Sequence, residues 1–526
     1  MPAPAADGPP GKRAQRREGT RASAAPRAAG GRRGLVVAAL MLAMALTAMD
    51  SSIVATAVPQ IVGDLGGFAY YSWMFSGYLL AVTVSLPVYG KLADSVGRRP
   101  VLLAGTALFI AGSLLCAGAW SMPVLIAFRL VQGFGGGAIQ GTVQTLAGDL
   151  YPMEQRGRIQ AAISTVWAVS AVSGPALGGV FAGYADWRWI FLINLPIGAG
   201  ALWLLWRHLV EPRREPSAAR RPLRIDWLGA LGLLSSTGLL LFGLVQGGTA
   251  WAWGSPPSLL VFAGAVLLGA ATVLVERRAA EPIIPGWVWR RRPILGANLF
   301  LCFFGLLMIA PTVFLPTYAQ SVLGLAPIAA GFVLSVMTVS WPIASALANR
   351  IYLRVGFRNT SLIGMSFATL LLASFVLLPY RGPAWQPALL MFAIGAGLGL
   401  SQIPLIVGVQ SSVPWGERGT ATASVLFCRQ VGQSIGAVLF AVVANTTIAG
   451  RLRDAPARVR GGLPSTLDGV SRALDGHRGT PAARDYLRHA VTASVDHVYL
   501  GAAACAVCSL LILFFVTPKR FPVVRD

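Results

Sequence analysis

The sequence predicts an all-α protein that crosses a membrane many times, and three observations lead to this fold class. The 526-residue chain is 55% hydrophobic and only 12% charged, which leaves too few polar residues to cover a water-soluble globule. Apolar runs of about 20 residues, the length that a helix needs to cross a bilayer, recur along the chain. The runs are continuous rather than alternating, which favours helices over the strands of a membrane β-barrel.

We count fourteen apolar runs of this kind, and the basic loops between them group the runs as six, two and six. The predicted spans lie at about residues 35–58, 70–89, 101–119, 122–150, 159–184, a sixth ending near 206, 225–246, 258–275, 293–318, 328–348, 360–378, 386–408, 420–446 and 496–516. The predicted organisation is a disordered basic tail at 1–34, a six-helix half at 35–210, a two-helix insertion with basic flanking loops at 211–292, a second six-helix half at 293–516 with a long outer loop at 447–495, and a C-terminal segment at 517–526.

The net charge of +23 would suggest a nucleic-acid partner in a soluble protein. Here most Lys and Arg residues lie in the tails and in the loops on one side of the predicted spans. Because positively charged loops stay in the cytoplasm, the sequence predicts that both termini are cytoplasmic. The membrane that we expect is the plasma membrane. We expect no nucleic-acid partner, and the tail is a candidate for contact with membrane lipids.

Asp50 and Arg129 stand inside predicted spans, where a charge costs about 2.5–3.5 kcal/mol unless it is paired or faces water. Counting about 1.5 Å per residue, Asp50 lies about 12 Å and Arg129 about 10 Å from the outer ends of their spans. The two groups therefore lie at comparable depth and could share a water-filled pocket, with Asp50 as a proton carrier. The alternative is a permanent ion pair that only fixes the packing of helices. Gln132, one turn after Arg129, is a candidate for the cavity wall.

A third intramembrane charge, Arg429, lies in the second half, with Gln430 beside it and Gln433 one helical turn away. These three residues could line the same cavity from the other side. Alternatively, Arg429 is neutralised by backbone carbonyls or by a helix end.

The segment 90–99 is a polar connection between two apolar runs. Its Asp94 can pair with Arg98 four residues later or with a helix N-terminus, while glycines allow the backbone to turn tightly. The alternative is a solvated cytoplasmic loop. The residues of interest are Gly90, Asp94, Gly97, Arg98 and Arg99.

A weak internal repeat supports two related halves. A shift of 259 residues lays the segment 90–99 over 349–358, with Gly97 on Gly356 and Arg99 on Arg358. Asp94 falls on Leu353, so the second copy lacks the carboxylate. Two related six-helix halves are typical of transporters.

Other kinds of site find little support. The four histidines are in no mid-membrane position, and the five cysteines fall in apolar runs without companion ligands. No strand precedes the glycines that follow Gln132, so a nucleotide-binding loop is disfavoured. We therefore expect no enzyme activity, no metal site and no cofactor.

With these residues in view, the chain resembles the major facilitator superfamily, and in particular its fourteen-span drug:proton antiporter branch. The segment 90–99 is similar to the signature loop of that superfamily. Six motifs carry the resemblance in the right order: 50–59 with Asp50, Ser51 and Pro59; 90–99; Arg129 with Gln132 and Gly133; Gly174, Pro175, Gly178 and Gly179; Trp189 through Asn194, Pro196 and Gly198; and Arg429 through Gly436.

The resemblance implies alternating access, in which two halves rock about a central cavity and proton entry is coupled to substrate exit. It implies that Arg129 assists proton transfer, that Asp94 latches the halves on the cytoplasmic side, and that the glycines and proline at 174–179 form an antiporter helix. Some relatives carry an acidic residue in span ten that helps to recognise cationic drugs. The run 331–349 has none here, which weakens a claim for dicationic substrates.

The expected function is a monomeric, proton-driven antiporter that exports an amphipathic small molecule such as an antibiotic, a dye or a secondary metabolite. One alternative is a dedicated exporter of one lipid or self-made metabolite. A membrane receptor or scaffold, which would use the 1–33 tail and the long outer loop for partners, is a remote alternative.

Overall fold

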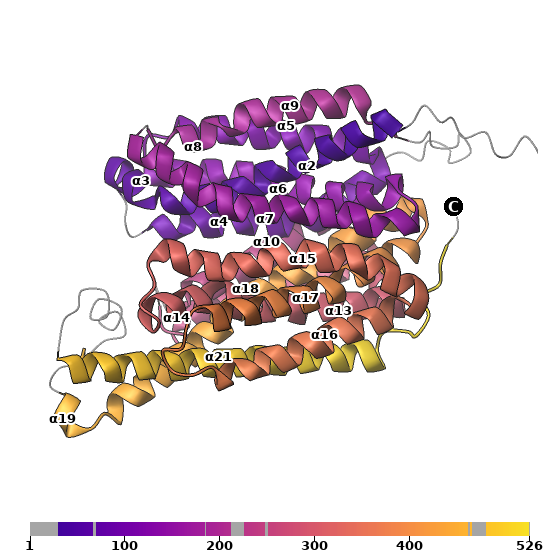
Figure 1. Cartoon of the computed structure of the whole chain (residues 1–526). Helices are drawn as coiled ribbons and strands as arrows, with labels where there is room; N and C mark the ends of the chain where they lie inside the picture. The colour runs from indigo at the N-terminus through magenta and orange to yellow at the C-terminus, as the bar shows by residue number, and fades with distance from the viewer. Residues whose placement is uncertain are drawn as a thin grey trace, which may run out of the picture.

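The computed structural model describes residues 30–66, 70–184, 186–211, 226–247, 251–460, 463–464 and 480–524. Over these ranges the chain is helical, and the pairing of Gly247 with Trp251 is an isolated bridge. Fourteen of the described helical segments are long and apolar enough to cross a membrane, which confirms the predicted all-α, fourteen-span fold. They lie side by side as a bundle (Figure 1).

The N-terminal half contains six spans, with a short 3-10 turn and helix after the first. Its elements are α2 (Gly30–Ile53), η2 (Val54–Thr56), α3 (Val58–Leu65), α4 (Tyr71–Val96), α5 (Arg98–Ala117), α6 (Met122–Leu150), α7 (Met153–Tyr184), and α8 (Trp189–Leu192) with α9 (Asn194–His208).

The insertion and the C-terminal half supply the other eight spans. Their elements are α10 (Trp227–Gln246), α11 (Pro256–Arg278), α12 (Trp287–Arg290), α13 (Arg292–Leu307), η4 (Ala310–Phe314), α14 (Leu315–Ser321), α15 (Pro327–Val355), α16 (Phe357–Ser374), η5 (Phe375–Leu377), α17 (Trp385–Ser411), η6 (Trp415–Glu417), α18 (Arg418–Arg453), α19 (Ala457–Arg460) and α21 (Pro481–Phe515). The ninth span is irregular between α13 and α14, where Pro311 lies in a π-helical turn, because proline has no N–H to donate.

The two halves each bury their own apolar clusters and meet along two pairs of helices. α4 packs against α18, and α7 packs against α15. The halves form two layers, indigo to magenta for the first and orange to yellow for the second (Figure 1). The insertion helices α10 and α11 pack on each other, and α10 also contacts α4 and α18, so the insertion lies beside the junction of the halves.

The structure carries the repeat that the sequence indicated. Gly97 separates α4 from α5 with φ of 116°, and Gly356 separates α15 from α16 with φ of 88°. Glycine alone adopts such angles without steric cost. Arg99 donates to a carbonyl in the last turn of α9, and Arg358 donates in the same way to Leu513 in the last turn of α21. The equivalent residues thus tie equivalent helices together in both halves.

The prediction of a long outer loop at 447–495 is wrong in much of its extent. α18 continues to Arg453 and α21 already begins at Pro481. The first turns of α21 bury Ala483, Leu487 and Val491, which follow helical spacing. Charged residues between them lower the local hydropathy, so the sequence predicts the apolar run only from 496. Residues 1–29 of the predicted tail, and 461–462 and 465–479 of the predicted loop, lie outside the described residues.

Candidate functional site

Asp50 and Arg129 form a buried ion pair in the N-terminal half. Asp50 lies on α2 and Arg129 on α6, and Nη1 of Arg129 is 2.5 Å from Oδ2 of Asp50. The exposed fraction is 1% for Asp50 and 0% for Arg129. An unpaired charge at this depth is costly, and the pairing offsets that cost for both side chains.

Three polar side chains complete the hydrogen bonding around this pair. Gln132 donates from Nε2 to Asp50 at 2.9 Å and to Ser113 at 2.7 Å, and its Oε1 accepts from Arg129 at 2.7 Å. Asn194, at the start of α9, donates to Ser113 at 3.2 Å. Gln132 was expected on the cavity wall, but the structure places it in this buried cluster. Ser113 was not anticipated, because a lone serine in an apolar run carries no signal.

Tyr78 of α4 contacts this cluster and also lines a cavity between the two halves. The guanidinium of Arg129 lies 4.3 Å from the centroid of the Tyr78 ring, and its Nε donates to the carbonyl of Met74 at 3.2 Å. Tyr78 also lines the cavity, whereas Asp50 and Arg129 are not among the residues that line it. The expected water-filled pocket shared by the two charges is therefore wrong for this conformation, because both side chains point into the N-terminal half.

The glycines after Gln132 serve close helix packing. A Cβ added at Gly133 would lie 2.6 Å from the carbonyl oxygen of Tyr78, and one added at Gly135 would lie 2.7 Å from Cα of Phe109. Only glycine lets α4 and α5 approach α6 so closely. This packing holds Tyr78 against Arg129.

The predicted antiporter helix is α7, which packs against α2. It carries Gly174, Pro175, Gly178 and Gly179. A Cβ added at Gly174 would lie 2.6 Å from Cβ of Ser52, and one added at Gly178 would lie 2.8 Å from the carbonyl oxygen of Ile53. Gly179 faces open space. Gly174 and Gly178 therefore bring α7 close to the helix that carries Asp50.

A cavity of about 860 Å³ lies between the two halves. α18 lines it with one face, namely Leu426, Arg429, Gln430, Gln433, Ser434, Ala437, Val438, Ala441, Val442 and Asn445. The spacing of three and four residues is that of a helix stripe, about 28 Å long. The structure thus places Arg429, Gln430 and Gln433 on the cavity wall. The insertion contributes Leu241 of α10 and Trp253, so it forms part of the same wall.

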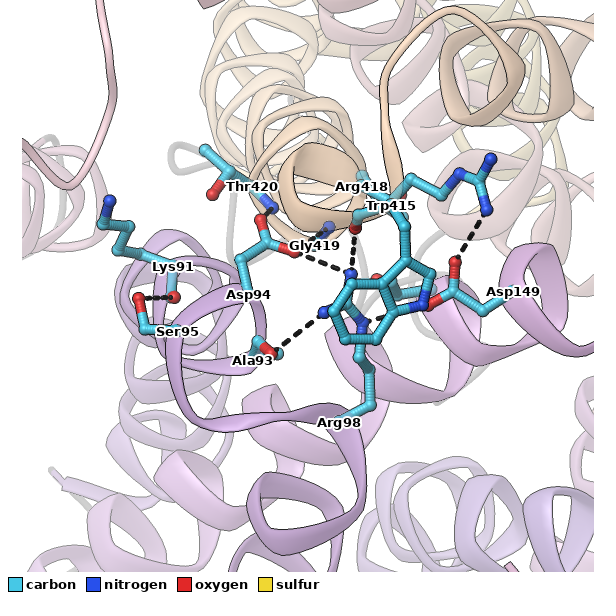
Figure 2. Close-up of polar contacts among 12 residues, drawn as sticks. Lys91, Ala93, Asp94, Ser95, Arg98, Asp149, Trp415, Arg418, Gly419 and Thr420 are labelled. Atoms are coloured by element: carbon cyan, nitrogen blue, oxygen red, sulfur yellow. Dashed lines mark hydrogen bonds and ion pairs between the residues drawn. The ribbon is translucent and has the colours of Figure 1, made fainter. Parts of the chain in front are cut away.

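At one end of the bundle, Asp94 of α4 caps the N-terminus of α18 (Figure 2). Its carboxylate accepts the backbone N–H of Gly419 at 2.8 Å and that of Thr420 at 2.7 Å. The N-terminus of a helix carries partial positive charge, which favours a carboxylate there. A Cβ added at Gly90 would lie 2.8 Å from the carbonyl oxygen of Gly419, so glycine is required where these helices meet.

Arg98 connects two carboxylates in the same place (Figure 2). It donates to Asp94 at 2.9 Å and to Asp149 at 2.9 Å, and Asp149 also accepts from Arg418 at 3.2 Å. The guanidinium lies 3.6 Å from the centroid of the Trp415 ring and donates to the Trp415 carbonyl. Arg98 is 0% exposed, which does not fit a solvated loop. The alternating charges join α4, α5 and α6 to the start of α18.

Gly97 and Arg99 tie this end to α9. Glu211 accepts the N–H of Arg98 at 2.8 Å and that of Arg99 at 3.4 Å, so it caps the start of α5. The side chain of Arg99 donates to the carbonyl of Trp206 at 2.7 Å. Glu211 was not anticipated, since it lies in a polar connection far along the chain.

The second copy of the segment makes a neutral contact of its own. Asn349 donates to the carbonyl of Glu154 at 2.5 Å, and the Tyr352 hydroxyl donates to the carbonyl of Met153 at 2.9 Å. These bonds join α15 to the start of α7, as Asp94 joins α4 to the start of α18. The second copy therefore lacks the carboxylate but makes an uncharged contact at the equivalent place.

A smaller polar cluster joins α3 to the residues before α8. Asp64 accepts from Trp187 Nε1 at 3.0 Å and from Arg188 at 3.0 Å. These hydrogen bonds, first from Trp187 and then from Arg188, hold the pKa of the exposed Asp64 carboxyl below its usual value of 3.8. Among the described residues, no group of three or more His, Cys, Asp or Glu is arranged to hold a metal ion.

Comparison with known proteins extends these observations. Residues 40–437 match the family model described as Major Facilitator Superfamily. The chain is 32% identical over 494 residues to Multidrug resistance protein 3 of Bacillus subtilis, covering 92% of this chain and 95% of that protein. It is also 32% identical to the multidrug transporter protein MdtP of the same organism over 448 residues, covering 85% and 81%.

The fold has solved counterparts as well. The proton:xylose symporter XylE superposes with a TM-score of 0.57 over 93% of this chain and 97% of that one, at 13% identity. At that identity the likeness concerns the fold alone. Since the family model spans both six-helix halves and the B. subtilis relatives match over most of their length, the chain belongs to the major facilitator superfamily of membrane transporters.

Proposed function

We propose that this protein is a proton-coupled antiporter that exports amphipathic small molecules across the plasma membrane by alternating access, with both termini in the cytoplasm. The observation that carries this proposal is the buried pair of Asp50 and Arg129, whose guanidinium packs on Tyr78, a side chain that also lines a large cavity. A proton site and a cargo site that share a wall can each respond to the occupancy of the other.

In this scheme Asp50 takes up and releases the proton. Protonation removes the negative charge beside Arg129 and leaves the guanidinium with neutral hydrogen-bond partners and the Tyr78 ring. Because Tyr78 lines the cavity, a change in how Arg129 is held reaches the cargo site directly. Cargo that contacts Tyr78 would favour one position of Arg129 and so one protonation state of Asp50.

The contacts around Asp94 would keep the halves closed at the cytoplasmic end while the cavity faces outward. The stripe on α18 begins at Leu426, about two turns after the helix starts at Arg418, so the cavity lies beyond this network. Opening toward the cytoplasm requires the bonds from Gly419 and Thr420 to Asp94 to break. Re-forming them would return the carrier, now loaded with cargo from the cytoplasm, to the outward state.

The printed names of the relatives support export rather than uptake. Multidrug resistance protein 3 and MdtP are both described as proteins of multidrug resistance or transport, and an efflux pump of Dothistroma septosporum is 31% identical over 94% of this chain. The cavity volume of about 860 Å³ is that of sites for drug-sized molecules.

Everted membrane vesicles test the proposal. Respiration acidifies the interior of the vesicles, and the fluorescence of a pH-sensitive dye reports this. Each exported compound should release protons from the interior and restore the fluorescence of the dye. A response to many unrelated amphipathic compounds supports a multidrug exporter, and a response to one compound indicates a dedicated exporter. Vesicles without the protein are the control. If no compound of a broad panel releases protons beyond that control, proton-coupled export is refuted.

A further inference from the structure

We propose that the preferred cargo is an amphipathic organic anion whose acidic group pairs with Arg429. This inference names the substrate class of the cavity and rests on the proposed function, because it takes the cavity to be the cargo site. It depends on the charges, the unpaired polar atoms and the apolar surface of the cavity wall.

The described residues that line the cavity carry one formal charge, on Arg429. No Asp or Glu is among these lining residues, and the nearby Asp50 is buried in its ion pair with Arg129. The other polar side chains of the wall are neutral hydroxyls and amides, including Gln160, Gln402 and Gln433. A cationic molecule would meet a like charge here and no carboxylate to compensate for its lost hydration.

Within the described part of the chain, the side chain of the half-buried Arg429 has no hydrogen-bond or ion-pair partner. Its Nε is buried without a hydrogen bond, and no carboxylate of the described residues lies within 4.0 Å of its guanidinium. Arg129 and Arg98, by contrast, are each paired with an aspartate. A half-buried guanidinium is a strong, bidentate partner for a carboxylate or sulfonate, so an anion would supply the missing contacts.

A second unpartnered side chain faces the same cavity from the other half. Gln160 of α7 is 1% exposed, and neither its amide nitrogen nor its amide oxygen has a hydrogen-bond partner. A buried amide left unpaired costs free energy that a ligand can recover. Arg429 and Gln160 together indicate that the cavity is built to hold a polar group of its cargo.

The rest of the wall suits an apolar body. Between Ser434 and Asn445 the stripe of α18 is apolar, with Ala437, Val438, Ala441 and Val442. Near the start of the stripe, Phe304 and Trp341 also line the cavity, and their rings pack edge to face with centroids 5.6 Å apart. An acidic group at Arg429 would therefore leave the remainder of an amphipathic molecule against aromatic and aliphatic surface.

Binding of three matched probes to the purified protein in lipid nanodiscs tests the inference. Dansylglycine is an anion, dansylglycinamide is its neutral analogue, and dansylcadaverine is a cation, and equilibrium dialysis against empty nanodiscs corrects for partition into lipid. We expect the anion to bind most tightly. Arg429→Gln should weaken its binding roughly ten- to hundredfold and leave the neutral amide unchanged, since a charge-assisted hydrogen bond is lost.

Two further variants secure the interpretation. Arg429→Lys keeps the positive charge but loses the planar fork, so the affinity for dansylglycine should fall less than in Arg429→Gln. Arg350→Gln removes an exposed arginine at the end of α15 and should change nothing. Any one of four results would overturn the proposal. These are equal affinity for dansylglycine and its amide, tighter binding of the cation, no saturable binding of the anion, and unchanged anion binding in Arg429→Gln. None of these readouts uses a proton gradient, so a failure of proton coupling in vesicles is a separate result.

Discussion

Replacing Asp94 by asparagine tests whether the 90–99 segment controls the opening of the halves. The carboxylate accepts two backbone N–H groups of α18, from Gly419 at 2.8 Å and Thr420 at 2.7 Å. Asparagine can keep one of these acceptors but loses the charge. A hydrogen bond to a charged group contributes about 1.5–3 kcal/mol, so we expect the closed arrangement to lose about 2–4 kcal/mol relative to the open one. That loss shifts the equilibrium about 30- to 700-fold.

Spin labels at Val96 and Gly416 measure this shift, because the two exposed positions lie at the end of α4 and just before α18. The labels are placed in a functional background without the five native cysteines. Double electron–electron resonance should then show that the population with the longer distance between the two labels is larger in Asp94→Asn than in the protein with Asp94. Transport should slow because the return to the closed arrangement becomes limiting, while binding to the purified protein persists. Lys91→Gln, which removes only a partly exposed ion pair to Glu281 at 3.4 Å, should change neither readout. Unaltered distances and rates in Asp94→Asn would refute the role of the segment as a latch.

Three further changes test the N-terminal half. Arg129→Gln leaves Asp50 buried without its guanidinium partner and should lower the free energy of unfolding by about 3–5 kcal/mol. The double variant with Asp50→Asn should recover most of this loss. A loss below about 1 kcal/mol in the single variant would contradict the buried pair. Gly174→Val forces α7 away from α2 and should reduce transport strongly. Gly179→Val places its side chain in open space and should leave transport unchanged. Equal effects of the two variants on transport would show that the contact between α7 and α2 is unimportant. Asp64→Asn should leave the pH dependence of transport between about pH 5 and 8 unchanged. A carboxyl with a pKa below 3.8 stays charged in that range and loses its pairing only as the pH falls further. A shifted pH profile would place a coupling group outside the Asp50 cluster.

The fourteen spans and the comparable depth of Asp50 and Arg129 could be anticipated from simple rules. Bilayer thickness sets the length of a span, and the constant rise of a helix sets the depth of a residue within it. Depth, however, does not specify the direction of a side chain. The separation of the ion pair from the cavity depends on Tyr78 of a third helix and on the glycines of α6 that admit it.

The polar network at the 90–99 end shows a second limit. Asp94 and Arg98 could be singled out because both lie in one short polar segment. Asp149, Glu211 and Arg418 lie at ordinary ends of apolar runs or in connections, where charged residues are common. Their roles come from tertiary contacts between distant parts of the chain, and no local pattern distinguishes them from solvated charges.

The measurement that tests the account most directly is gradient-driven accumulation in liposomes that contain the purified protein. With an acid interior, the wild-type protein should accumulate the compound that responds best in vesicles, by about tenfold for each proton exchanged across one pH unit. Asp50→Asn should still exchange that compound down its own gradient but should not accumulate it against one. Accumulation by Asp50→Asn at the wild-type level would contradict the assignment of Asp50 as the proton site.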